Sequence, residues 1–126
     1  MILIVDSSVL IDHLRNDARA VDRLVTAAEQ GHEVWSVSMV RTEIYAGARP
    51  GEDAEISYLL DRLRWLDVGA DLADRAGRLA ATYRRSHSGI DTVDFLLAAA
   101  TQELNAELLT LSVKHFPMFP GLQRAY

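Results

Sequence analysis

The feature that most constrains the fold is an alternation of short apolar runs with longer segments of helical periodicity. Residues 2–5 are four apolar, largely β-branched side chains with no polar position among them. A strand of this kind is typical of a parallel sheet that helices cover on both faces. Further short strands are predicted at residues 33–38, 64–68 and 107–111. Because strands separated by helices pair in parallel through right-handed crossovers, the pattern predicts an α/β fold with a parallel sheet sandwiched between helices.

Helical periodicity fills the intervals between the predicted strands. Helices are predicted at residues 17–30, 39–48, 53–64, 71–86 and 92–105, and a further one starts at residue 7 or 8. In the helix that starts at residue 17, Val21, Leu24, Val25 and Ala28 recur at the spacing of one helix face. Gly31 is placed to end that helix.

Composition restricts the kinds of protein this chain can be. Its 126 residues suffice for one sizeable core and are too few for two, so we expect one domain over residues 1–126. The absence of cysteine excludes disulfides and thiolate metal sites, which fits a cytoplasmic protein. The apolar stretches fall far short of the roughly 20 residues that span a bilayer. A net charge of −5 argues against non-specific binding of nucleic acid through a wide positively charged surface.

Four acidic residues occupy positions where the local sequence pattern does not explain a charged side chain. Asp6 follows the first strand at its carboxyl end, the end at which parallel sheets bind ligands. Glu43 lies on or beside the inward stripe of its helix. Asp94 directly precedes the apolar run Phe-Leu-Leu-Ala-Ala-Ala, where an unpaired carboxylate costs several kcal/mol. Asp91 lies on the first turn of the same helix.

If Asp6, Glu43 and Asp94 meet at one pocket, their mutual repulsion must be relieved by protonation of some of them or by a bound cation. These segments contain no lysine that could serve as the cation. A divalent ion with oxygen ligands, Mg²⁺ or Mn²⁺, is the simplest source of the compensating positive charge. Enzymes that act on phosphates typically bind such an ion through a few carboxylates. Such an ion would activate water for phosphodiester hydrolysis, with Glu43 able to position or deprotonate that water.

Two of these acids also have structural explanations at helix starts. Asp6 could cap the helix that follows it, with Ser7 and Ser8 as neighbouring capping groups. Asp91 suits a helix N-terminus, where a negative charge meets the positive end of the helix dipole. Asp94 has the weakest structural explanation, because Asp91 or Thr92 is better placed to cap the helix.

Glu43 could instead turn to solvent and pair with Arg41 or Arg49. The histidines show no spacing typical of metal ligands, and we interpret them as surface or packing residues. They are His13, His32, His87 and His115. Arginines 75, 78, 84 and 85 could form a local basic stripe, although a solvated helix face explains them more simply.

Three stretches together resemble a known family. "ILIVDSSVLID", "SVSMVRTEIYAGA" and "VDFLLAAATQELNAELLTLSVKHFPMFPGL" match, in order and spacing, the motifs of PIN-domain ribonucleases, in particular VapC-type toxins of bacterial type II toxin–antitoxin pairs. The resemblance covers essentially the full chain. It implies that Asp6, Glu43 and Asp94 form a Mg²⁺ site, and these are the same acids that the residue pattern selects.

The resemblance carries further expectations. It implies a three-layer α/β/α sandwich and Mg²⁺-dependent endonucleolytic cleavage of RNA, possibly of tRNA or another structured RNA. It also implies a homodimer and neutralisation by a cognate VapB-like antitoxin, whose C-terminal segment occupies the active-site groove. We therefore assign Asp6, Glu43, Asp91 and Asp94 as catalytic residues, with Asp6 and Asp94 as metal ligands.

One departure from the family pattern concerns the segment after the fourth strand. Many members carry a further Asp there, in a stretch of the form T-x-N-x-x-D-F. This chain reads Thr-Leu-Ser-Val-Lys-His-Phe, with Ser112 for the Asn and His115 for the Asp. Asp91 is our first candidate for the missing acid and His115 the second, so a weaker or single-ion site is one expectation.

Two other functions compete with the nuclease. A phosphoacceptor receiver domain also places acids at strand ends, but it needs an acidic pair after the first strand, where this chain has Asp6 followed by Ser7. Its lysine would have to be Lys114, the only one in the chain. A PIN-like binding module that has lost its cleavage chemistry is the other alternative.

Overall fold

A four-stranded parallel sheet forms the centre of the computed structural model, which describes residues 1–126. The strands are β1 (Ile2–Val5), β2 (Glu33–Val37), β3 (Arg64–Leu66) and β4 (Glu107–Leu109), in the order β3-β2-β1-β4. β1 therefore lies between β2 and β4, and its Ile4 is in register with Trp35 on one side and Leu108 on the other. All four predicted strands and their parallel pairing are confirmed.

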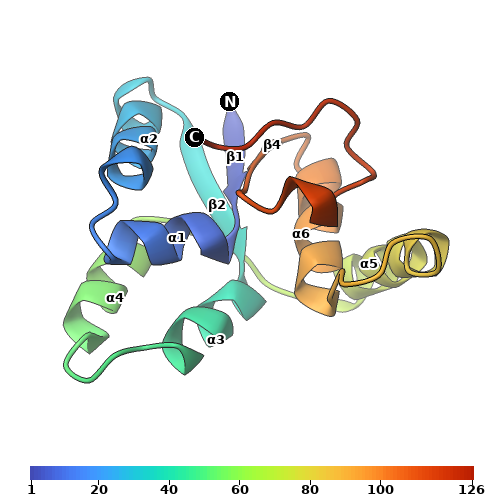
Figure 1. The fold of residues 1–126 in the computed structure, drawn as a ribbon, viewed down its shortest axis with the longest axis horizontal. Helices are drawn as coiled ribbons and strands as arrows, with labels where there is room; N and C mark the ends of the chain where they lie inside the picture. Colours follow the sequence, from blue (N-terminus) through green and yellow to red (C-terminus); the bar gives the residue numbers. More distant parts are fainter.

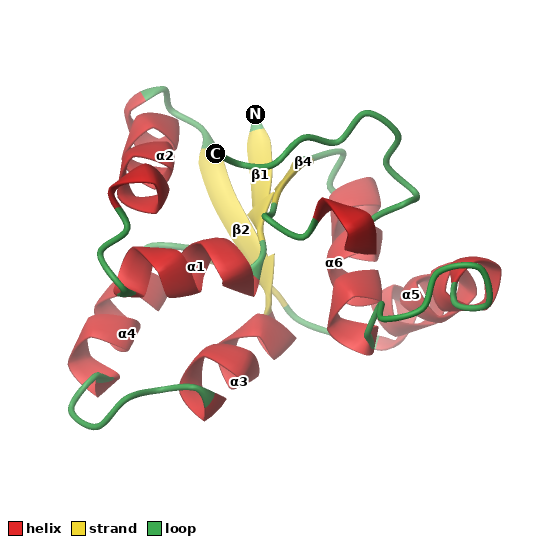
Figure 2. Cartoon of the chain, in the orientation of Figure 1, coloured by secondary structure: helices red, strands yellow, loops and turns green.

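Helices cover both sides of this sheet. They are α1 (Ser7–Leu14), α2 (Ala18–Glu29), α3 (Ser38–Ala46), α4 (Asp53–Leu60), α5 (Ala70–Tyr83) and α6 (Thr92–Glu103). Figure 1 shows α1 and α2 on one side of the strands and α5 and α6 on the other, with α3 beyond the carboxyl ends of the strands. The layers of helix, strand and helix in Figure 2 confirm the predicted sandwich.

α6 is the most deeply buried helix. Its residues from Asp94 to Thr101 are all buried, because the sheet, α5 and the C-terminal segment enclose it. Leu97 has no exposed surface, and Phe95 only 1%. Phe116 from the C-terminal segment joins the same core, which contains 24 buried apolar residues. This burial fixes the start of α6, and hence Asp91 and Asp94, relative to the sheet.

The C-terminal segment is ordered by backbone hydrogen bonds rather than by a long element. A short 3₁₀ turn covers Val113–His115 directly after β4. The chain then returns across the sheet, where the Ala125 N–H donates to the carbonyl of Thr110 at 2.9 Å. The turn at residues 113–115 brings His115 back toward the start of α6.

Two details of the predicted helices are wrong. α4 ends at Leu60, earlier than predicted, and the indole N–H of Trp65 donates to the Leu60 carbonyl at 2.9 Å. α2 buries Ala20 and Ala27, whereas Val25 is 46% exposed. Small alanines let α2 approach its neighbours closely, so the helix is rotated away from the face that the larger residues suggest. The end of α2 is as predicted, because Gly31 takes the left-handed conformation with φ +77°.

No helix has the length and apolar character that crossing a bilayer requires, and the longest one, α5, has 14 residues.

Candidate active site

Asp6 lies at the middle of the carboxyl edge of the sheet. Its N–H donates to the Leu109 carbonyl at 2.9 Å, so the backbone continues the pairing between β1 and β4 one residue beyond the strand. The side chain is only 5% exposed. Asp6 occupies the N-cap position of α1, yet its carboxylate makes no capping hydrogen bond. The capping explanation is therefore wrong, and the carboxylate is free to serve another purpose.

Three hydroxyl groups hold the Asp6 carboxylate. Thr110 donates to Oδ2 at 2.6 Å, and Ser8 donates to the same oxygen at 3.3 Å. Ser7 donates to Oδ1 at 3.2 Å. Ser7 and Ser8 thus bind Asp6 and do not cap the helix as predicted. Three neutral donors orient a buried carboxylate without cancelling its charge, which leaves that charge available to a cation.

Thr110 is a site residue that the sequence analysis missed. It is fully buried one residue beyond β4, and its Oγ1 also accepts the Ser112 N–H at 2.9 Å. The sequence does contain a pattern that could have identified it, because Thr110 directly follows an apolar strand, as Asp6 does. β4 pairs with β1, so the two polar side chains meet at the same edge.

We expect Thr110→Val to lower the free energy of unfolding by about 2 kcal/mol, since the buried Asp6 carboxylate loses its shortest hydrogen bond. Urea denaturation measures this change. Thr101→Val is the matched control, because the Thr101 hydroxyl is also buried but donates only to the Leu97 carbonyl of its own helix. Equal losses for both variants would contradict a special role for Thr110.

Asp91 and Asp94 form a reciprocal capping box at the start of α6. The Asp94 N–H donates to Asp91 Oδ1 at 3.0 Å, and the Asp91 N–H donates to Asp94 Oδ2 at 3.2 Å. The predicted capping role of Asp91 is confirmed. Asp94 takes part as well, which we did not expect. The capping box fixes both carboxylates, and Asp94 remains 7% exposed at the edge of the core.

His115 contacts Asp94 directly. Its Nδ1 lies 3.0 Å from Asp94 Oδ2, and the imidazole is 40% exposed. The interpretation of His115 as a surface or packing residue is therefore incomplete. The structure brings the second candidate for the missing acid into contact with Asp94, from the 3₁₀ turn that follows β4.

Glu43 lies on α3, partly buried, and forms no salt bridge. Neither of its two predicted arginine partners pairs with it. The Arg41 guanidinium lies over the Trp65 ring, 4.8 Å from the ring centroid, and the Arg49 side chain forms no salt bridge. The pairing explanation for Glu43 is wrong, and its carboxylate is left without a cation.

Burial and mutual repulsion change the acidity of two of these carboxyl groups. Burial raises the pKa of Asp94 to about 6, and the charges of Asp91 and Asp6 add to the increase, while the Asp91 N–H and His115 oppose it. Burial also raises the pKa of Glu43, and so do the charges of Asp91 and Asp6. Asp6, Glu43, Asp91 and Asp94 therefore lie close enough to affect one another.

The donor groups fit a hard divalent ion. They are carboxylate oxygens with an excess of negative charge, and no arginine or lysine pairs with Asp6, Glu43 or Asp94. No three acidic or histidine side chains are grouped closely enough to enclose an ion by themselves. Mg²⁺ in enzymes that act on phosphates typically uses one or two carboxylates and keeps several waters, so two side chains suffice.

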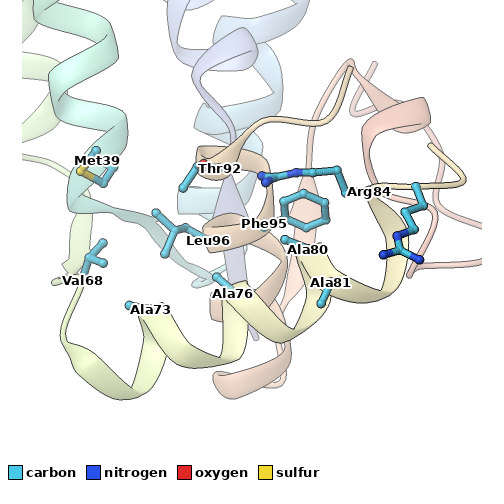
Figure 3. A pocket seen from close by; sticks show the side chains of 12 residues that line it. Met39, Val68, Ala73, Ala76, Ala80, Ala81, Arg84, Thr92, Phe95 and Leu96 are labelled. Carbon is cyan, nitrogen blue, oxygen red and sulfur yellow. The ribbon is translucent and has the colours of Figure 1, made fainter. Parts of the chain in front are cut away.

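An apolar groove of about 800 Å³ borders the start of α6. Figure 3 shows it between α5 and α6, with Met39 of α3 at one end. Arg84 lies over the Phe95 ring, 5.7 Å from its centroid, and with Arg85 it brings positive charge to the groove. Thr92 lines the groove and directly follows Asp91, so the groove opens beside the acidic site. The remaining lining residues are Val68, Ala73, Ala76, Gly77, Ala80, Ala81 and Leu96.

Comparisons with known proteins agree with this geometry. Residues 3–112 match the family model described as PIN domain. The chain is 42% identical to Ribonuclease VapC19 of Mycobacterium tuberculosis over 123 residues, 98% of each chain. It is 41% identical to Ribonuclease VapC10 of the same organism over 122 residues, which cover 96% of this chain and 90% of that one.

A solved structure shows the same fold. The crystal structure of VapBC2 from Rickettsia felis bound to a DNA fragment from their promoter matches with a TM-score of 0.81, at 22% identity over 97% of this chain and 96% of that chain. The receiver-domain alternative is wrong, since residues 3–112 match the PIN domain model. The chain belongs to the PIN-domain family, and within that family to the VapC group of ribonucleases.

Proposed function

We propose that this protein is a metal-dependent endoribonuclease that serves as the toxin of a toxin–antitoxin pair. What supports the proposal is the placement of Asp6 at the carboxyl edge of the sheet and of Asp91 and Asp94 at the start of α6, where the charges of Asp91 and Asp6 raise the pKa of Asp94 and of Glu43. Relatives that are 41–42% identical along nearly the whole chain are named ribonucleases. Phosphodiester hydrolysis is a reaction that such an arrangement of carboxylates performs with a divalent ion.

Each acid has a separate proposed task. Asp6 and Asp94 hold the ion, for which we propose Mg²⁺ with Mn²⁺ as a substitute; PIN-domain ribonucleases generally depend on a divalent metal. When bound, the metal supplies charge stabilisation for the phosphodiester and activation of water. Glu43 accepts a proton from the attacking water, and its raised pKa brings it closer to the range of a general base. Asp91 holds Asp94 in place through the capping box.

Asp6→Asn tests this proposal. We expect the wild-type protein to cleave RNA with Mg²⁺ or Mn²⁺ and to stop when EDTA is added, and we expect Asp6→Asn to cleave poorly under every condition. Asp74→Asn on the exposed surface of α5 removes the same charge away from the site and should cleave like wild type. If wild type and Asp6→Asn behave alike with every metal, the nuclease proposal fails and an inactive binding module remains.

A protein partner is the second part of the proposal. The solved structures with this fold include complexes described as VapBC and as toxin–antitoxin. We propose that a VapB-like antitoxin inserts a segment into the apolar groove of about 800 Å³ and so blocks access to Asp94. Arg84 and Arg85 would pair with acidic side chains of that segment, since neither arginine forms a salt bridge within the chain.

Growth of the producing cells gives a test of the toxin role. Expression of the wild-type chain without its partner should slow growth, because RNA is cleaved without restraint. Co-expression of the small DNA-binding protein that the neighbouring reading frame is expected to encode should restore growth, and Asp6→Asn should be harmless by itself. Normal growth of cells that contain abundant wild-type protein would contradict the toxin role.

We further propose that residues 1–126 act as one catalytic domain, that the domain forms a homodimer and that it works in the cytoplasm, where its RNA substrate is found. Exposed apolar side chains such as Val25 and Tyr58 supply surface that a second copy could bury. Light scattering on the purified protein measures the mass of the assembly.

A further inference from the structure

We propose that His115 is a nitrogen ligand of the metal ion beside Asp94, with Asp6 acting on the ion through a bound water, and that the imidazole shifts the preference of the site from Mg²⁺ toward transition ions such as Mn²⁺. This inference rests on the proposed function, because it assigns a further ligand to the same site. It starts from one contact, in which His115 Nδ1 lies 3.0 Å from Asp94 Oδ2.

The separation of these two atoms suits joint binding of one ion. Adjacent donor atoms around an octahedral ion with bonds of about 2.1 Å lie about 3.0 Å apart. In the structure the imidazole and the carboxylate already lie at this separation, as hydrogen-bond partners. A metal ion can therefore replace the shared proton without a large movement of either side chain.

The backbone of His115 is fixed by the same segment that holds Asp6. Thr110, at the end of β4, donates to Asp6 at 2.6 Å, and the turn that follows places His115 against Asp94. The His115 N–H donates to the Ser112 carbonyl at 2.9 Å, and Phe116 anchors the next position in the core with 1% exposure. One short segment thus contacts both carboxylates that we assign as metal ligands.

The other histidines make no such contact. His115 is the only imidazole that lies within 4.0 Å of a carboxylate. His87 shares a hydrogen bond with Ser86 at 2.8 Å, and His32 precedes β2, at the opposite edge of the sheet from Asp6. A histidine nitrogen found on a bound ion would therefore come from His115.

The expected chemical effect follows from ligand type. Carboxylates, carbonyls and water suit Mg²⁺, whereas imidazole favours first-row transition ions over it. A site that contains one imidazole should bind Mn²⁺ with a larger advantage over Mg²⁺ than a site made only of carboxylates. Replacing the imidazole with a carboxylate should remove that extra advantage.

Electron spin echo modulation of bound Mn²⁺ tests the assignment directly. Protein without a polyhistidine tag, loaded with one equivalent of Mn²⁺, should show ¹⁴N modulation from a bound imidazole. His115→Asp should bind Mn²⁺ without that modulation, because the aspartate keeps an oxygen ligand in the same place. His32→Gln is the matched control and should keep the nitrogen signal.

Calorimetry with Mg²⁺ and Mn²⁺ gives a second measurement. The ratio of the two dissociation constants should change by about tenfold between wild type and His115→Asp, with the wild-type protein favouring Mn²⁺ more. Mn²⁺ binding by wild type without ¹⁴N modulation would overturn the ligand assignment and leave His115 as a hydrogen-bond partner of Asp94. An absence of Mn²⁺ binding would overturn it as well.

The proposed function fails on a different result. RNA cleavage by wild type without nitrogen modulation would overturn only the role of His115. A wild-type protein that shows the nitrogen modulation but cleaves no RNA with any metal would support the ligand assignment and overturn the nuclease. The two proposals are therefore tested separately.

Discussion

Asp94→Asn is expected to reduce RNA cleavage by about 1,000-fold, because the proposed metal site loses one of its two charged ligands and with it several kcal/mol of charge stabilisation. The amide keeps the shape of the side chain and can still accept the Asp91 N–H, so the start of α6 should remain folded. Cleavage rates of a labelled RNA, measured with saturating Mg²⁺, give the effect. A rate within tenfold of wild type would contradict the assignment of Asp94.

The same variant should be more stable than wild type when no metal is present. Burial raises the pKa of Asp94 to about 6 in the folded protein, above its ordinary value, so the folded state holds this proton more tightly than the unfolded state. Stability from this group is therefore present at low pH and is lost as pH rises through about 6. In EDTA at pH 7, Asp94→Asn should melt at a higher temperature than wild type, and this advantage should disappear near pH 4. A lower melting temperature at pH 7 would show that the ionised carboxylate stabilises the fold.

Leu97→Ala is expected to cost about 2–5 kcal/mol of the free energy of unfolding, which is a large part of the stability of a domain of this size. Leu97 lies in the middle of α6 with no exposed surface, between the sheet and the rest of the core. Removal of its side chain leaves a cavity beneath the helix that carries Asp94. Urea denaturation followed by circular dichroism measures the loss.

Gln102→Ala provides the control on the same helix. Gln102 is exposed, so its replacement should change the free energy of unfolding by no more than about 0.5 kcal/mol. If Leu97→Ala is as stable as Gln102→Ala, then α6 is not packed as the structure shows. Loss of cleavage in Leu97→Ala at temperatures where the variant is folded would show that the position of Asp94 depends on packing under α6.

The sheet and the position of Asp6 were predictable because they depend on local patterns. An apolar run that ends in a carboxylate identifies both a buried strand and its carboxyl end. Glu43 and Asp94 were selected for the same reason, since each interrupts an apolar pattern. The face of α2 was not predictable from spacing, because Ala20 and Ala27 form the packed side while the larger Val25 stays 46% exposed.

The contacts of the C-terminal segment lay beyond sequence reasoning. Whether His115 touches Asp94 depends on the path of the chain through the turn at Val113–His115 and on the anchoring of Phe116. Thr110 reaches Asp6 only because β4 pairs with β1, and a strand order cannot be read from local periodicity. These partners are distant in sequence and are set by tertiary packing, whereas the acids themselves are recognised from their neighbours.

The hydrogen bond between Asp6 and Thr110 joins residues that are 104 positions apart. β1 lies between β2 and β4, so it can pair with β2 before β4 has been added to the sheet. Until β4 pairs with β1, the Asp6 carboxylate lacks the Thr110 hydroxyl. Docking of the last strand therefore both closes the sheet and completes the set of hydroxyl groups that orient Asp6.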